Sequence, residues 1–233
     1  MVTLVLFDVD GTILRGGTVA HREAFAEAFR TVYGRDISLD GLFLAGRTDT
    51  WLFFEALRRD GVPDDEIERR RAVAFQVMAR YVDDHLSDLR DRVLPGFPDI
   101  LDTLRAHKAT LGLLTGNLRP IAFAKMRHAG LGGYFVAGGF GGESAVRSDL
   151  VPVALDDARQ VAGRPFAAAE TIIIGDTPLD VEAGARHGTK TVAVATGPFS
   201  TEDLAASGPD LVLSSLDEPD AAQRILALVR PAA

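Results

Sequence analysis

Two carboxylates stand directly after a short apolar run near the start of the chain. Asp8 and Asp10 belong to Asp8-Val9-Asp10-Gly11-Thr12, which follows Leu4-Val5-Leu6-Phe7. A carboxylate at the end of a buried strand is costly unless it is paired or binds a metal. The alternative interpretation is a plain turn, because Asp-Gly is a common turn dipeptide.

A second polar segment, Thr115-Gly116-Asn117, follows the apolar residues Leu113 and Leu114. A helix is expected to begin near Pro120, and the start of a helix offers free backbone N–H groups to an anion. Taken alone, the segment is equally consistent with a turn and a capping residue.

A third segment, Gly175-Asp176-Thr177-Pro178-Leu179-Asp180, follows Ile174. Thr177 suits a helix N-cap, Pro178 suits the first helical position, and Asp180 stands where a capping box places an acid. Asp176 has no such structural explanation. An oxygen-rich site of this kind suits Mg²⁺, which prefers one or two carboxylates and water.

These segments must be positioned by the elements around them, and the pattern predicts a parallel α/β sheet. Short, continuously apolar runs alternate with amphipathic stretches, as in sheets that are covered on both faces. In such sheets, sites form beyond the carboxyl ends of the strands. The predicted strands are Leu4–Val9, Leu111–Leu114, Thr171–Ile174, Thr191–Ala195 and Leu211–Leu213. The predicted helices between them are Phe97–His107, Pro120–Ala129, Leu150–Val161, Pro178–His187 and Asp217–Val229.

The segment 16–92 interrupts this alternation and has a helical pattern only. Thr18 is a candidate N-cap for a first helix with Phe25 and Phe29 on its apolar face. Two further helices are expected at Thr48–Leu57 and Pro63–Leu89. We therefore expect a helical insert within a core made of residues 1–15 and 93–233.

Composition restricts the class of protein further. The chain has 233 residues, no cysteine and a formal charge of −8. These values exclude a disulfide framework and thiolate chemistry, and they argue against a nucleic-acid-binding surface. The N-terminal residues do not have the pattern of a signal peptide, and no apolar stretch is long enough to span a bilayer. We expect a soluble, cytoplasmic protein with neither nucleic acid nor membrane as partner.

Together, the three segments resemble the motifs of the haloacid dehalogenase superfamily, in that family's order and over nearly the whole chain. The resemblance implies an α/β fold with a Rossmann-like parallel sheet core flanked by helices. It also implies that residues 16–92 form an inserted all-helical cap domain, as in phosphoglycolate phosphatase-like members.

The resemblance further implies a role for each motif residue. Asp8 would be the nucleophile that forms an aspartyl-phosphate, and Asp10 the general acid and base. Mg²⁺ would be held by Asp8, the main-chain carbonyl of Asp10 and Asp176, with Asp180 close by. The residues expected to contact the substrate phosphate are Gly11, Thr115, Gly116 and Asn117.

The sequence departs from the family pattern at its basic residue, which is usually a lysine. Arg147 follows the glycine-rich stretch Gly138–Glu143 and precedes a helix, where the family places that lysine. We therefore assign the role to Arg147 and expect Lys125 to be an ordinary solvated position. Lys125 is the alternative, and it would take the role if Arg147→Ala kept full activity while Lys125→Ala was inactive.

The predicted insert contributes one candidate substrate residue. Arg47 lies in the loop Ala45-Gly46-Arg47-Thr48-Asp49, and it could equally be a surface residue at a helix start. Trp51 and the pair Phe53–Phe54 are expected to be core residues of the insert, and His21 a surface residue.

The leading functional hypothesis is a Mg²⁺-dependent phosphatase that hydrolyses a small phosphomonoester metabolite, phosphoglycolate-like or a sugar phosphate. The alternatives are a sugar phosphomutase of the same superfamily and a non-catalytic binding member. Haloacid dehalogenation is disfavoured, because members of the family with that chemistry lack the second aspartate and need no metal. In this chain, Asp10 and Asp176 are both present. The expected partner is a small phosphorylated metabolite, and the protein would be a monomer or a homodimer.

Overall fold

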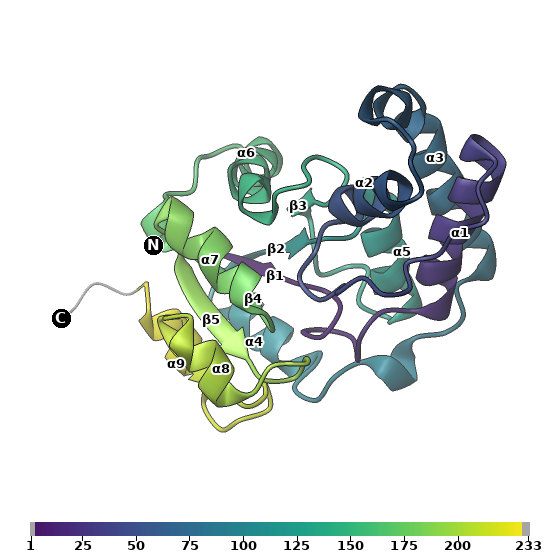
Figure 1. Ribbon diagram of the computed structural model, residues 1–233. Coiled ribbons are helices and arrows are strands. Elements are labelled where there is room, and N and C mark those ends of the chain that lie inside the picture. The colour runs from purple at the N-terminus through teal and green to yellow at the C-terminus, as the bar shows by residue number, and fades with distance from the viewer. Residues whose placement is uncertain (1–2, 230–233) are drawn as a thin grey trace.

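The computed structural model describes residues 3–229, which are built around a six-stranded parallel sheet (Figure 1). Across the sheet the strand order is β3-β2-β1-β4-β5-β6, so the first strand of the chain lies in the interior. The strands are β1 (Leu4–Phe7), β2 (Thr110–Thr115), β3 (Ala137–Phe140), β4 (Thr171–Gly175), β5 (Lys190–Val194) and β6 (Leu211–Leu213). The predicted α/β fold is confirmed, and so are five of its strands.

The strand β3 lies in the glycine-rich stretch, where the sequence pattern does not predict a strand. A Cβ atom on Gly138 would overlap the carbonyl oxygen of Leu113, and one on Gly139 would overlap that of Leu150. Close packing therefore requires glycine there, and glycine removes the β-branched and aromatic pattern by which strands are predicted.

Helices cover both faces of the sheet. The helices of the core are α4 (Asp99–Ala106), α5 (Arg119–His128), α6 (Leu150–Ala162), α7 (Pro178–His187), α8 (Thr201–Ala206) and α9 (Ala221–Ala227). Leu4 and Leu6 of β1 pack with α6 and α7, whereas Val5 and Phe7 face the side of α4 and α9, as the two-residue period of a strand requires. The short helix α8 was not predicted.

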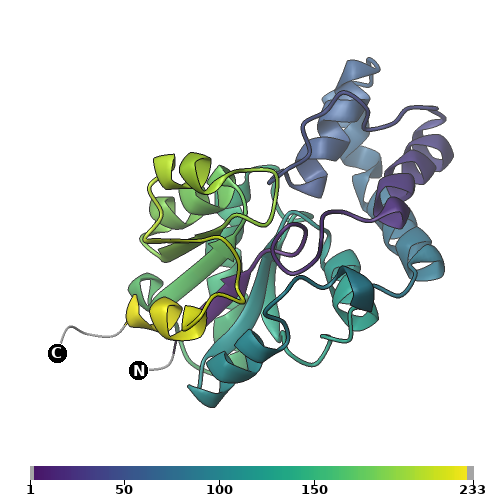
Figure 2. The ribbon, with the colours of Figure 1, turned by 90° about the horizontal axis from the view of Figure 1, so that it is seen from below.

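The segment between β1 and α4 contains α1 (Val19–Tyr33), α2 (Asp49–Arg59) and α3 (Asp64–His85), which lie together beyond one end of the sheet (Figures 1 and 2). We call these three helices and their loops the helical insert. Thr18 caps α1 as expected, accepting a hydrogen bond from the His21 N–H, and Thr48 caps α2 in the same way, accepting from the Trp51 N–H. The helix α3 is shorter than predicted, because the chain turns after His85 and the Leu89 N–H bonds to the core instead.

An aromatic cluster forms the centre of the helical insert. The ring of Phe53 is fully buried, and its centroid lies 5.1 Å from that of Phe29, 5.3 Å from Phe75 and 5.7 Å from Tyr33. Trp51 and Phe54 are half-buried against this cluster. The prediction that these aromatic residues serve packing is confirmed most clearly for Phe53.

The two chain segments that join the insert to the core run side by side. The Arg15 N–H donates to the Arg92 carbonyl oxygen at 2.8 Å, and the Leu94 N–H donates to Ile13 at 2.9 Å. The Arg92 guanidinium also donates to the carbonyl oxygens of Arg15 and Gly17. A domain boundary near residues 15 and 93 remains a prediction. Residues 1–2 and 230–233 of the predicted core lie outside the described residues.

Across residues 3–229, no helix combines the length and the hydropathy that crossing a membrane requires.

Candidate active site

The site begins where β1 ends beside β4. The Asp8 N–H donates to the carbonyl oxygen of Ile174 at 2.9 Å, which fixes Asp8 at the mouth of the sheet. The chain then turns at Gly11, whose φ is +99°, and a Cβ atom there would overlap the Asp176 carboxylate. The Thr12 hydroxyl donates to Asp176 Oδ1 at 3.2 Å. The turn therefore brings the first and third polar segments into direct contact.

Arg147 lies at the centre of a buried carboxylate cluster. Its Nη2 is 3.0 Å from Asp8 Oδ1 and 2.5 Å from Asp180 Oδ1. Burial alone would lower the pKa of Arg147, but Asp180 and Asp8 raise it above the ordinary value, so the guanidinium stays charged. The structure thus places Arg147 within hydrogen-bonding reach of Asp8, as expected.

The single positive charge of Arg147 does not balance the negative charges of the carboxylates around it. Burial, against the opposing effect of Arg147, raises the pKa of Asp8 from 3.8 to about 6. Burial, followed by repulsion from Asp8 and Asp180, raises the pKa of Asp176 to about 8. A further positive charge at this cluster would stabilise the ionised forms.

The donor set of this cluster fits Mg²⁺. One carboxylate oxygen from each of Asp8, Asp176 and Asp180 lies within 4.8 Å of the others. All donors are oxygen, as a hard divalent cation prefers. Asp180 is the most engaged of the three: its Oδ1 pairs with Arg147, and its Oδ2 accepts from the N–H and hydroxyl of Thr177 in the predicted capping box.

Asp10 faces a different cation, and here the sequence-based prediction was wrong. Lys125 does not point into solvent: it is fully buried, and its Nζ donates to Asp10 Oδ2 at 2.6 Å and to Asn117 Oδ1 at 2.5 Å. Burial would raise the pKa of Asp10, but the charge of Lys125 and the hydrogen bonds from Lys125 and Asn117 lower it below 3.8. Within residues 3–229, the buried Asp10 Oδ1 has no hydrogen-bond partner.

The second polar segment links this cation to the end of β2. Asn117 Nδ2 donates to Asp10 Oδ2 at 2.9 Å and to Thr115 Oγ1 at 2.8 Å. The Thr115 side chain is fully buried, whereas Gly116 and Asn117 line the cavity described below. The structure therefore brings Asn117 and Gly116 to the site surface and keeps the Thr115 hydroxyl behind them.

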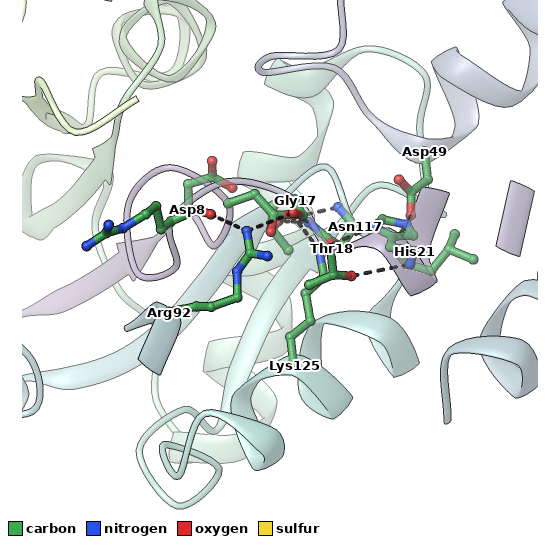
Figure 3. A network of polar contacts seen from close by, with 12 residues as sticks. Asp8, Gly17, Thr18, His21, Asp49, Arg92, Asn117 and Lys125 are labelled. Atoms are coloured by element: carbon green, nitrogen blue, oxygen red, sulfur yellow. Dashed lines mark hydrogen bonds and ion pairs between the residues drawn. The ribbon is translucent and has the colours of Figure 1, made fainter. Parts of the chain in front are cut away.

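His21 is also not the surface residue that the sequence suggested. It is buried; its Nε2 lies 3.0 Å from Asp49 Oδ2 and its Nδ1 lies 3.2 Å from Lys125 Nζ. Figure 3 shows His21, Asp49, Asn117 and Lys125 gathered in one polar network. Both Lys125 and His21 stand on the apolar faces of their helices, so helical periodicity offered a signal for their burial.

The helical insert is docked on the core at the start of α2. The Asp49 N–H donates to the Gly116 carbonyl oxygen at 2.7 Å, and the Thr50 hydroxyl donates to Gly141 at 2.6 Å. A Cβ atom on Gly116 would overlap the carbonyl oxygen of Arg47. Glycine at position 116 therefore permits the insert to approach the phosphate-binding candidate Gly116-Asn117.

A cavity of about 620 Å³ lies between the insert and the strand ends. Its core side includes Asp8, Asp10, Asn117 and Arg147, and its insert side includes Arg47. Arg47 is exposed, and its guanidinium carbon lies 4.3 Å above the centre of the Trp51 ring. The cavity therefore joins the predicted catalytic residues to the predicted substrate residue of the insert.

One further contact was not predicted. The Thr196 hydroxyl donates to the carbonyl oxygen of Gly11 at 2.6 Å, and a Cβ atom on Gly197 would overlap the Asp176 carboxylate. The loop after β5 thus closes over the carboxylate cluster. Its sequence, Thr-Gly-Pro, indicates only a turn.

The fold and the site define a hydrolase of one particular family. Residues 2–188 match the family described as haloacid dehalogenase-like hydrolase, and the chain belongs to that family.

Individual relatives extend over almost the entire chain. A phosphoglycolate phosphatase from Synechococcus elongatus is 28% identical over 228 residues, which cover 97% of this chain and 98% of the relative. A β-phosphoglucomutase structure from Clostridium difficile is similar with a TM-score of 0.67 at 17% identity, covering 99% of this chain and 100% of its own. The structure of CbbY from Rhodobacter sphaeroides in complex with phosphate has a TM-score of 0.64 at 19% identity, covering 94% and 96%. The structural similarities support the fold.

Proposed function

We propose that this protein is a Mg²⁺-dependent phosphatase that hydrolyses a small phosphomonoester through an aspartyl-phosphate on Asp8. The observation that carries the proposal is the position of Asp8: it faces Arg147 at 3.0 Å, belongs to an oxygen-donor cluster and lines the cavity. The family match and the phosphoglycolate phosphatase relative support the same activity.

Asp8 supplies the nucleophile in this proposal. One of its carboxylate oxygens forms a bond to phosphorus while the bond from phosphorus to the leaving oxygen breaks. Arg147 holds both Asp8 and a phosphoryl oxygen, which reduces the repulsion between two anions. The remaining phosphoryl oxygens would lie against Gly11, Gly116 and Asn117, which line the cavity. The Asn117 N–H donates to Thr115 Oγ1 and the Gly11 N–H to the Leu14 carbonyl oxygen, so a bound phosphoryl group would have to share these donors.

Asp10 moves the protons. It gives a proton to the leaving oxygen in the first step and takes one from the attacking water in the second. The lowered pKa of Asp10 suits the second, base role. For the first role, a phosphate dianion beside Asp10 favours its protonated form by like-charge repulsion. Oδ2 already accepts from Lys125 and Asn117, so we assign this exchange to Oδ1, which has no hydrogen-bond partner within residues 3–229.

Asp8, the main-chain carbonyl of Asp10 and Asp176 would hold Mg²⁺, with Asp180 fixing Arg147 beside them. When bound, the ion neutralises charge on the carboxylates and on the phosphoryl group.

The substrate is proposed to be a small phosphorylated metabolite. The docked insert limits the space over Asp8, and binding residues such as Arg47 lie on its loop. Residues 16–92 would act as a cap that opens for exchange and closes to exclude water. A cytoplasmic location and a monomeric or homodimeric state remain predictions.

The test is phosphate release from p-nitrophenyl phosphate with Mg²⁺ and with EDTA, followed by a panel of phosphorylated metabolites. We expect release that requires Mg²⁺ and is lost in Asp8→Asn. Asp65→Asn, an exposed change on α3, serves as the control with full activity. Absence of release from every compound would contradict the proposal, and an isomerised sugar phosphate without release would indicate a mutase.

A further inference from the structure

A polar chain behind Asp10 is not used by the chemistry above. It runs from Asp49 at the start of α2, through His21 on α1, to Lys125 on α5 (Figure 3). All three side chains are buried, with 3% exposure at Asp49, 8% at His21 and 0% at Lys125. Buried polar groups need complete hydrogen bonding, so each link of this chain constrains the next.

The hydrogen-bond donors of Lys125 determine the tautomer of His21. An ammonium group has three N–H donors and no acceptor, and Lys125 Nζ has three partners: Asp10 Oδ2, Asn117 Oδ1 and His21 Nδ1. His21 Nδ1 must therefore accept, which places the ring proton on Nε2. From there it is donated to Asp49 Oδ2 at 3.0 Å. Asp49 thus fixes the tautomer that provides the third acceptor of Lys125.

Asp49 is not needed to cap its own helix. The N-cap of α2 is Thr48, whose side chain accepts from the Trp51 N–H. The carboxylate of Asp49 instead accepts from His21 and from the Leu118 N–H at 2.7 Å, directly after Asn117. Its position and burial therefore serve a contact between the insert and the core.

Most links of the chain cross from the insert to the core. Asp49 bonds to Leu118 and Gly116, and His21 bonds to Lys125. When the insert separates from the core these contacts are lost together, and Lys125 then lacks one acceptor while it still holds Asp10. The geometry of Asp10 is consequently tied to the docked insert.

We propose that Asp49 is a positioning residue which, through His21 and Lys125, aligns Asp10 only while the helical insert is docked. The proposal rests on the proposed function, because it assigns Asp10 the transfer of a proton to the leaving oxygen. It makes the docked insert part of the proton-transfer machinery and not merely a cover for the substrate.

The first experiment compares leaving groups. An alkyl phosphate needs a proton on its leaving oxygen, whereas p-nitrophenolate leaves without one. We measure kcat/KM for both classes, because this parameter reports the steps through phosphoryl transfer. A misplaced Asp10 should therefore lower kcat/KM selectively for the alkyl substrate.

The variants are Asp49→Ala, Asp49→Asn and the control Asp65→Ala, an exposed acid in the first turn of α3. We expect Asp49→Ala to lose about tenfold to hundredfold on the alkyl phosphate, and less than about threefold on p-nitrophenyl phosphate. Asp49→Asn retains an acceptor oxygen and should recover part of the loss. Equal losses on both substrates, or no loss, would overturn the proposal.

His21→Phe provides the same comparison if Asp49→Ala does not fold. Phenylalanine keeps a ring beside Phe25, whose centroid lies 5.5 Å from that of His21, but offers no acceptor to Lys125. The same selective loss is expected, and equal loss on both substrates contradicts the chain of contacts.

The second experiment does not depend on activity. Nitrogen NMR of ¹⁵N-histidine-labelled protein distinguishes the two ring tautomers, and the signal missing in His21→Phe identifies His21 among the five histidines. We expect the Nε2–H tautomer in the wild type and a mixture of tautomers in Asp49→Ala. An Nδ1–H tautomer in the wild type refutes the chain of contacts even if phosphatase activity is present. Wild-type protein with the expected tautomer but without phosphatase activity would refute the proposed function instead.

Discussion

Asp8 and Asp10 are two residues apart, yet their surroundings shift their pKa values in opposite directions. On the side of Asp8, Asp8, Asp176 and Asp180 form a buried cluster in which Arg147 pairs with Asp8 and Asp180, and burial raises the pKa of Asp8 to about 6. On the side of Asp10, Lys125 outweighs burial and lowers the pKa. The first region has an excess of negative charge that a divalent cation would compensate, whereas the second is compensated by the chain's own lysine.

This difference separates two roles that the same type of side chain could fill. A nucleophile that works beside a metal needs surroundings that attract cations, and an acid and base must keep an oxygen free for proton exchange. Pairs of carboxylates whose environments push their pKa values apart are typical of such divided roles. The two regions should therefore differ in function as they differ in charge.

The largest effect is expected for Asp8→Asn. An amide does not attack phosphorus and does not neutralise a cation, so turnover should fall by about 10⁴-fold or more. Arg147 keeps Asp180 as its partner, so the variant should fold. Phosphate release and thermal unfolding check both points. Near-wild-type turnover with Mg²⁺ would remove Asp8 from the role of nucleophile.

The next effect distinguishes the two cations. Arg147→Ala should lower kcat by about 10²–10³-fold, as for loss of a donor to the transition state, and Arg147→Lys should restore part of it.

The variant Lys125→Met should instead raise the pKa of Asp10, so the acidic limb of the kcat–pH profile should move to higher pH. Full activity in Arg147→Ala together with an inactive Lys125→Ala would exchange the roles of the two residues.

A third effect concerns stability and Mg²⁺. The pKa values of Asp8 and Asp176 are raised in the folded protein, so the folded state binds more protons than the unfolded state between about pH 4 and pH 8. These two groups therefore make the metal-free protein less stable as the pH rises through that range. We expect Mg²⁺ to raise Tm more at pH 8 than at pH 5.5, and Asp176→Asn to reduce the difference. An equal rise at both pH values would show that the ion does not bind this cluster.

The smallest effect is expected for Arg47→Ala, which lies in neither region. It should raise KM severalfold for the metabolite that the substrate panel identifies, and change kinetics with p-nitrophenyl phosphate little, because Arg47 lies on the insert side of the cavity. Steady-state kinetics with both substrates decide the matter. Comparable losses on both would place Arg47 in catalysis or in the packing of the insert through Trp51.

The strand ends could be predicted from the sequence because each carries a local pattern. An apolar run followed by Asp8, Thr115 or Asp176 marks a buried strand and its exit. The helices of the insert could be predicted from the apolar face of α1 and from its N-cap Thr18. In contrast, β3 could not be predicted from the sequence, because close packing requires glycine at positions where strands usually have branched residues.

The burial of Lys125 beside Asp10 could not be predicted from a local sequence pattern. Lys125 was judged as an isolated charge, and an isolated lysine on a helix is usually exposed. Its burial depends on Asp10, Asn117 and His21, which lie 115, 8 and 104 positions away in sequence. Only the position of Lys125 on the apolar face of α5, next to Ile121 and Ala122, gave a local indication.

The interior place of β1 has a consequence for the making of the protein. Its four apolar residues pair with Thr110–Leu113 on one side and with Thr171–Ile174 on the other. The ribosome therefore releases this strand long before either partner exists, and at about 5–20 residues per second the wait lasts about 5 to 30 s. The helices of the insert are made during that interval from contacts close in sequence, which form faster than distant strand pairs. During translation, the apolar strand that precedes Asp8 therefore stays without its strand partners and is open to misassociation with other chains.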